Sequence, residues 1–212
     1  MGGRFAFIFA AVVALGAATG GTFSKAVASD ILDEWANVTT PAAPEIKTVT
    51  VEPKTTALIM GDLMNQTCGK RPRCVAALPA IKRLLGEALA AKVAVIYTLP
   101  PNTTTADFIA DVAPAADEPS VQSGVDKFFK TNLQQILKDR GIQTIILVGT
   151  SAEGFVIYTG GGAALRGLNV IIPADGMASV GAFAEQYVAW HMTHAPIISP
   201  KVTLTRTDMI KF

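Results

Sequence analysis

From residue 56 onward, short apolar runs alternate with segments of helical periodicity, and this alternation constrains the fold more than any other feature of the chain. The runs are short and almost continuously apolar, and they lie at 56–61, 93–98, 144–148, 169–173 and 202–204. Strands of a parallel sheet are buried on both faces, so they show such runs instead of a regular apolar–polar alternation. The sequence therefore predicts a three-layer, Rossmann-like α/β domain with a mainly parallel sheet.

The segments between the apolar runs carry the start and stop signals of helices. Pro79 near the start of one segment and Gly141 after the end of another are examples. Helices are expected at 77–91, 106–112 (a short one), 132–140, 154–166 and 182–193. A long loop is expected at 113–126, which is rich in Pro, Asp and Ser.

The first 28 residues have the pattern of a signal peptide. Arg4 precedes the apolar run 5–18, and the small-x-small pattern of Ala26-Val27-Ala28 predicts cleavage after Ala28. The alternative is a membrane anchor that stays attached, but the run is shorter than the roughly 20 residues of a spanning helix. We therefore expect a periplasmic or secreted protein that has no membrane association after cleavage. Residues 29–54 would form an N-terminal arm and residues 55–212 the domain.

The charge balance gives no reason to expect nucleic acid as a partner. The chain has 18 Lys and Arg against 17 Asp and Glu, and cleavage would remove Arg4 and Lys25, leaving 16 − 17 = −1. The only basic cluster is Lys70, Arg71 and Arg73. It is either a solvated turn or a local rim that attracts anions.

The two cysteines, Cys68 and Cys74, lie close together in the predicted loop CGKRPRC. In an oxidising compartment such a pair is typical of a disulfide. Two alternatives remain open: Cys68 as a reactive nucleophile near the cleft, or two unpaired structural thiols. The spacing does not fit a zinc site, because no second Cys/His pair accompanies it.

Four segments in order resemble the isochorismatase-like cysteine hydrolases, over residues 55 to about 206. They are ALIMGDLMNQ (57–66), VQSGVDKFFKTNL (121–133), ILVGTSAEGFVIYT (146–159) and GLNVIIPADGMAS (167–179). The resemblance implies the three-layer fold and a site at the carboxyl ends of the strands. It also implies the family's chemistry, in which an Asp takes a proton from a Cys, a Lys stabilises charge and backbone N–H groups hold the oxyanion.

Carried over position by position, the family's Asp is Asp62, its Lys position holds Gln122 and its Cys position holds Phe155. A phenyl ring cannot act as a nucleophile, and no Cys occurs between 75 and 212. Thiol catalysis from the usual turn is therefore excluded. Lys127 and Lys130 lie near the Lys position, and a local shift could bring one of them into the site, although we expect both to be exposed to solvent.

Other polar residues near the expected cleft have two interpretations each. Burial would raise the pKa of Asp62, which could then act as a general base or simply hydrogen-bond the adjacent turn. Glu153 could share a proton or a metal with Asp62, or could favour a helix N-terminus. His191 and His194 have a spacing open to metal ligands, but it is also typical of a helix end. We predict no metal and no cofactor.

Two functional classes follow from this pattern. In the first, the chain is a thiol-independent hydrolase of a small amide, ester or vinyl ether that uses Asp62. In the second, it is a non-catalytic protein that binds a small ligand in the cleft beside Phe155. A structural or assembly role is a third possibility. The expected partner is a small molecule, and the resemblance also allows a homo-oligomer.

Overall fold

The computed structural model describes residues 29–212, and the expected signal peptide lies outside this range. These residues divide into two units, 29–41 and 42–212. The first is a short segment with a turn at 31–37, where the backbone N–H of Leu32 donates to the Asp30 carboxylate (2.8 Å). The second is the α/β domain. No helix within 29–212 combines the length and the apolar character that a bilayer span requires.

The domain is built on a sheet of seven strands, all paired in parallel. Its strand order is β4–β3–β2–β5–β6–β8, and β7 pairs with the end of β5. The strands are β2 (Thr56–Gly61), β3 (Ala94–Leu99), β4 (Ser120–Gln122), β5 (Thr144–Thr150), β6 (Asn169–Pro173), β7 (Met177–Ala178) and β8 (Val202–Thr205). The predicted mainly parallel α/β fold is confirmed.

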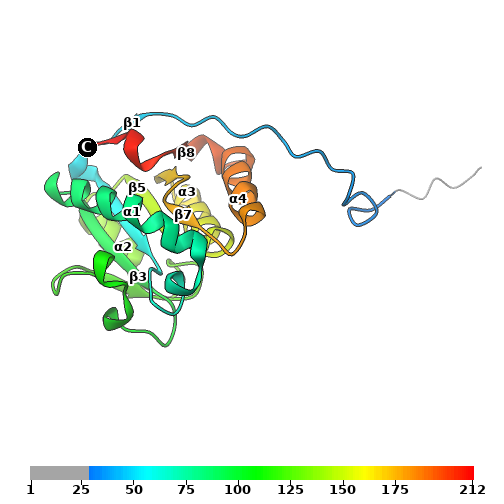
Figure 1. Cartoon of the computed structure of the whole chain (residues 1–212). Coiled ribbons are helices and arrows are strands. Elements are labelled where there is room, and N and C mark those ends of the chain that lie inside the picture. The colour runs from blue at the N-terminus through cyan, green and yellow to red at the C-terminus, as the bar shows by residue number, and fades with distance from the viewer. Residues whose placement is uncertain (1–28) are drawn as a thin grey trace, which may run out of the picture. The chain divides into compact units, whose positions relative to one another are not determined.

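Helices cover both faces of the sheet, as the ribbon shows (Figure 1). They are α1 (Pro72–Ala90), α2 (Leu133–Asp139), the π-helical segment η5 (Ala152–Gly160), α3 (Gly161–Leu165) and α4 (Ala182–His194). Alternate side chains of β2 point to opposite faces, as the period of a strand requires. Leu58 and Met60 pack with α1 in one core cluster, whereas Ala57 and Ile59 pack with α2, η5, α3 and α4 in the other.

Three of the expected helices differ in the structure, and two of these segments contain proline or glycine. Helix α1 begins at Pro72 and tolerates Pro79 in its first turns, so it starts five residues earlier than expected. The expected helix 154–166 is instead η5 followed by α3. The expected short helix 106–112 is two 3₁₀ turns, η3 (Thr105–Asp107) and η4 (Ala110–Val112).

Four short strands were missed because each is too short to carry a periodic signal. Strand β4 lies within the expected loop 113–126, and β7 follows the turn at 175–176. Strand β1 (Val49–Thr50) pairs in parallel with β9 (Ile210–Lys211), beside the C-terminus (Figure 1). The end of the expected arm 29–54 is thus part of the compact unit.

Candidate active site

Asp62 lies at the carboxyl end of β2, at the edge of the sheet where β3 and β5 also end. Its backbone has φ = 52°, in the left-handed region that Asp tolerates better than most residues. Two hydrogen bonds hold this conformation: the Asp62 N–H donates to the Thr98 carbonyl (3.3 Å), and Thr67 Oγ1 donates to the Asp62 carbonyl (2.5 Å). The side chain, 14% exposed, is thereby turned toward its partners across the strand ends.

Lys127 is the cation that pairs with Asp62. Its Nζ lies 2.8 Å from Asp62 Oδ1 and 2.9 Å from Oδ2. It also donates to the carbonyls of Ser123 (3.0 Å) and Leu99 (3.3 Å), so the ammonium has several acceptors. Thr98 Oγ1 donates to Asp62 Oδ1 (2.9 Å). The lysine side chain is completely buried, and the pair forms a closed polar network at the end of the sheet.

The turn that carries Lys127 is held by η5. Thr159 Oγ1 accepts the backbone N–H of Lys127 (3.1 Å) and donates to the Val125 carbonyl (2.9 Å). Thr159 is fully buried, so this link ties the Lys127 turn to the face of η5 that packs on the sheet. The position of the ammonium is therefore set by packing and does not depend on a mobile surface side chain.

Burial is the largest influence on the pKa of both partners, and it favours their neutral forms. Burial raises the pKa of Asp62, while Lys127, Thr98 and the charge of Arg71 act in the opposite direction. Burial lowers the pKa of Lys127, and the attraction of Asp62 partly restores it. A pair with these two opposed shifts can exchange a proton more easily than two exposed groups.

Lys127 was expected to be solvent exposed, and that expectation is wrong. Gln122, which the resemblance assigned to the Lys position, is exposed at the end of β4. Its Nε2 donates to the carbonyls of Pro100 (3.1 Å) and Thr103 (2.7 Å), which lie in the loop after β3. The local shift considered from sequence thus brings Lys127 to Asp62. The sequence signal for a buried Lys127 was its position directly before Phe128, which is itself buried.

Phe155, at the position that the resemblance assigns to the Cys, packs inside the protein. The side chain is 1% exposed and belongs to the core cluster of α2, α3 and α4. Its ring covers Gly61, the residue directly before Asp62. Phe155 therefore does not project into solvent from the turn after β5, and it fills the space beside the last residue of β2.

Glu153 is exposed and does not join Asp62 through a hydrogen bond or an ion pair within residues 29–212. Its carboxylate accepts a hydrogen bond from Ser179 Oγ, and the Ser179 N–H donates to Glu185 (2.9 Å). Glu185 in turn pairs with Arg73. The two carboxylates proposed from sequence are thus held by different partners.

The cysteines are joined. Cys68 and Cys74 form a disulfide with an S–S distance of 2.04 Å, and both residues are buried. The predicted disulfide is confirmed, and the alternatives of a reactive Cys68 or of unpaired thiols are wrong. Because these are the only cysteines of the chain, the protein has no free thiol for catalysis.

The histidines of α4 contact aromatic rings. His191 lies against Tyr187, with ring centroids 5.6 Å apart, and His194 stacks on Trp190 at 5.1 Å. Both are in the last turn of the helix, as expected. Among residues 29–212, no three His, Cys, Asp or Glu side chains gather as a candidate metal site.

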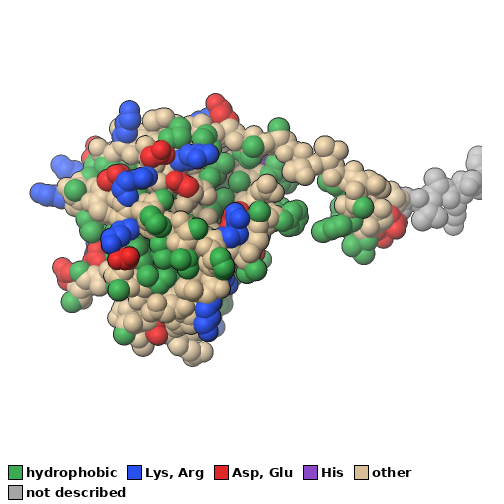
Figure 2. Space-filling view, in the orientation of Figure 1, with side chains coloured by type: hydrophobic (Ala, Val, Ile, Leu, Met, Phe, Trp, Pro, Cys, Tyr) green, Lys and Arg blue, Asp and Glu red, His purple; other side chains and the backbone are tan. Residues whose placement is uncertain are grey.

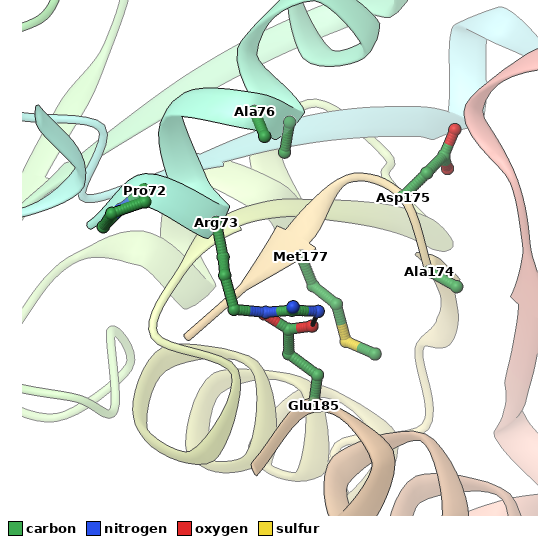
Figure 3. A pocket seen from close by; sticks show the side chains of 8 residues that line it. Pro72, Arg73, Ala76, Ala174, Asp175, Met177 and Glu185 are labelled. Atoms are coloured by element: carbon green, nitrogen blue, oxygen red, sulfur yellow. Dashed lines mark hydrogen bonds and ion pairs between the residues drawn. The ribbon is translucent and has the colours of Figure 1, made fainter. Parts of the chain in front are cut away.

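A groove of about 430 Å³ is lined by residues of α1, β7 and α4 and of the turn before β7 (Figure 3). Arg73 from α1 and Glu185 from α4 face each other across it, with Met177 of β7 beside them and Asp175 at its other end (Figure 3). Asp175 is engaged with Thr207, whose N–H and Oγ1 both donate to it. Neither Asp62 nor Lys127 lines this groove, so it is distinct from the ion pair.

With the strand order, the Asp62–Lys127 pair and the turn after β5 established, the comparisons with known proteins decide the family. The model of the isochorismatase domain matches residues 56–201. The chain belongs to the isochorismatase family. The match covers β2 through the segment before β8 and includes Asp62, Lys127 and Phe155. The comparison with curated proteins returned no match.

Solved structures of the isochorismatase family share the fold at low sequence identity. An isochorismatase-like hydrolase from Alkaliphilus metalliredigens is 21% identical over 73% of this chain and 87% of its own, with a TM-score of 0.66. A cysteine hydrolase from Pseudomonas syringae pv. phaseolicola is 21% identical over 79% and 95%, with a TM-score of 0.67. A nicotinamidase from Staphylococcus aureus is 17% identical over 72% and 99%, with a TM-score of 0.63.

Proposed function

We propose that this isochorismatase-family protein is an exported, thiol-independent hydrolase of a small amide, ester or vinyl ether, with Asp62 as its acid–base group. The observation that carries the proposal is the buried ion pair of Asp62 and Lys127. Burying a charged pair is often no more stabilising than placing apolar side chains at the same positions. A pair with shifted pKa values at the ligand-binding edge of a parallel sheet therefore supports a chemical role.

For an amide or ester, the proposed reaction needs only water as the nucleophile. Asp62 takes a proton from water while the water oxygen bonds to the carbonyl carbon. The resulting oxyanion is stabilised by Lys127 and by backbone N–H groups of the turn at 150–155. As the bond to the leaving group breaks, Asp62 returns the proton to the departing nitrogen or oxygen. For a vinyl ether, the protonated carboxyl would instead supply a proton to the substrate carbon. Water would then add to the neighbouring carbon and return a proton to Asp62, and the C–O bond of the resulting hemiketal would break to give a carbonyl compound and an alcohol.

Export is part of the same proposal. The expected signal peptide supports it, and so does the Cys68–Cys74 disulfide, because disulfides persist in oxidising compartments.

A non-catalytic, ligand-binding role is the second candidate, and Phe155 favours it. A fully buried ring at the family's Cys position removes space next to Asp62. In this case the ion pair would serve to hold a small ligand or the turn itself.

A hydrolysis screen separates the two candidates. The protein without residues 1–28 is assayed on small amides, esters and vinyl ethers, together with Asp62→Asn and, as a matched control, Asp111→Asn. Asp111 is an exposed carboxylate paired with Lys82, so its loss should leave turnover unchanged. The proposal expects turnover that falls at least about 100-fold in Asp62→Asn. Binding of panel compounds without turnover would favour the non-catalytic role.

A further inference from the structure

The loop closed by the disulfide places Arg71 at the candidate active site. Its Nη1 donates to Thr150 Oγ1 (2.6 Å), and Thr150 is the buried last residue of β5. Gly149 of β5 and Gly61 of β2 are the last paired residues of these adjacent strands. Thr150 and Asp62 are the residues that come directly after them. The charge of Arg71 also acts on Asp62, as noted for the pKa of that carboxyl.

The guanidinium of Arg71 takes part in no ion pair among residues 29–212, and its charge reaches Asp62 without direct contact. No carboxylate there forms an ion pair with it, and its only recorded side-chain partner is the neutral Thr150 hydroxyl. A guanidinium has five N–H donors, so most of them remain available. By contrast, Arg73 in the same loop is neutralised by Glu185.

The local charge balance at Asp62 is positive. Lys127 and Arg71 act on one carboxylate, which gives 2 − 1 = +1 at the end of β2. The nearest other acidic group in sequence to Thr150 is Glu153, which is engaged by Ser179. On the face shown in Figure 2, basic and acidic side chains are interspersed, without a continuous basic region.

The disulfide restrains the backbone on both sides of Arg71. Cys68 begins the 3₁₀ turn η2 (Cys68–Lys70), and Cys74 lies in the first turn of α1. The Arg71 N–H donates to the Cys68 carbonyl (2.9 Å), and the Val75 N–H donates to the Arg71 carbonyl (3.0 Å). Arg71 is therefore attached to a rigid seven-residue loop, and its side chain is partly buried.

We propose that Arg71 binds a carboxylate of the substrate, and that the Cys68–Cys74 disulfide holds its guanidinium in place for this contact. The inference rests on the proposed function for the location of the reacting bond, and it narrows the substrate class to small organic anions. A planar guanidinium with free donors matches a carboxylate in two parallel hydrogen bonds. Arg71 is thus a binding residue, and Asp62 and Lys127 remain the reacting groups.

Direct binding tests this proposal without requiring turnover. Calorimetry compares acetate, pyruvate and benzoate with their neutral amides on the wild-type protein, Arg71→Gln, Arg71→Lys and Lys70→Gln. Lys70 lies in the same loop and is exposed, so Lys70→Gln removes the same charge without touching the site. We expect at least one acid to bind at least about 10-fold more tightly than its amide. This preference should vanish in Arg71→Gln, be partly kept in Arg71→Lys and persist in Lys70→Gln.

The proposal is overturned if the wild-type protein prefers no acid over its amide, or if Arg71→Gln retains the preference. A preference lost equally in Lys70→Gln would show a general charge effect and would also overturn it. If acids bind through Arg71 but no compound of the hydrolysis screen turns over, the proposed function fails while the binding inference stands.

Discussion

The Phe155 ring rests directly on Gly61: a Cβ built on Gly61 would lie 2.1 Å from Cε1 of the ring. Gly61 ends β2, and Asp62 follows it. The ring and the glycine are thus fitted to each other at the position where the chain leaves the sheet and Asp62 begins. A large side chain at 155 requires the absence of one at 61.

The first prediction concerns this fit. Gly61→Ala should destabilise the protein by about 1–3 kcal/mol, because the added methyl group overlaps a buried ring. Phe155→Leu removes part of the ring and leaves a small cavity. The double variant should therefore lose less stability than the sum of the two single variants, by at least about 1 kcal/mol, as measured by urea unfolding. Strictly additive losses would mean that the two residues do not contact each other.

The second prediction concerns the energetic coupling of Asp62 and Lys127. Asp62→Asn leaves a buried ammonium without its partner, and Lys127→Met leaves a largely buried carboxylate. Each should lower the free energy of unfolding by roughly 3 kcal/mol. The double variant removes both charges, so its loss should be clearly smaller than the sum. The same unfolding experiment measures all three, and an additive result would rule out a tight pair.

The third prediction is the pH dependence of hydrolysis for amide or ester substrates. The mechanism that we propose needs the Asp62 carboxylate and the Lys127 ammonium. Burial raises the pKa of Asp62 above its usual 3.8, so activity should rise with pH through a midpoint above that value. Burial lowers the pKa of Lys127 below its usual 10.5, so activity should fall at a midpoint below that value. The profile of kcat/KM against pH reports both midpoints.

Lys127→Met provides the matching control for the pH profile. It should lower kcat/KM at every pH, because the ammonium that stabilises the oxyanion is gone. The residual activity should lack the alkaline fall and show an acid midpoint further up, since the attraction that lowers the pKa of Asp62 is also gone. A profile unchanged in this variant would assign both limbs to other groups.

The fourth prediction concerns the disulfide. Reduction, or the double variant Cys68→Ser/Cys74→Ser, should lower stability by about 2 kcal/mol, the value expected for a closed loop of this length. It should also weaken the binding of the preferred carboxylate, because the Arg71 loop gains freedom. In Arg71→Gln, reduction should cause no further loss of preference for acids over amides. Calorimetry with and without reductant makes both comparisons.

Much of the fold could be predicted because the sequence expresses it locally. The apolar runs of β2, β5 and β6 are short, and a strand in a covered sheet is the arrangement that buries a run of this length. The run at 169–173 matches β6 residue for residue. Strands β1, β4, β7 and β9 could not be predicted. Each has two or three residues, and their pairing depends on segments far away in the chain.

A site residue could be predicted where it directly follows a strand. It could not be predicted where the conformation of a loop determines its position. Asp62 follows β2 directly, so its place at the sheet edge follows from the pattern. Lys127 reaches Asp62 from an irregular turn whose shape depends on Thr159 of η5, 32 residues away in sequence. Counting positions from Phe128 therefore pointed to Gln122. The role of Arg71 depends on the side-chain contact with Thr150, which no spacing in the sequence reveals.

Turnover by a protein without any thiol tests thiol-independent hydrolysis most directly. The double variant Cys68→Ser/Cys74→Ser contains no cysteine at all. Its kcat is measured at saturating concentration of a substrate found in the screen, beside the wild-type protein and Asp62→Asn. If hydrolysis depends on Asp62 and needs no thiol, the double variant retains kcat within a few fold, whereas Asp62→Asn loses at least about 100-fold. Loss of turnover in the cysteine-free variant while it remains folded, or full turnover in Asp62→Asn, would contradict this mechanism.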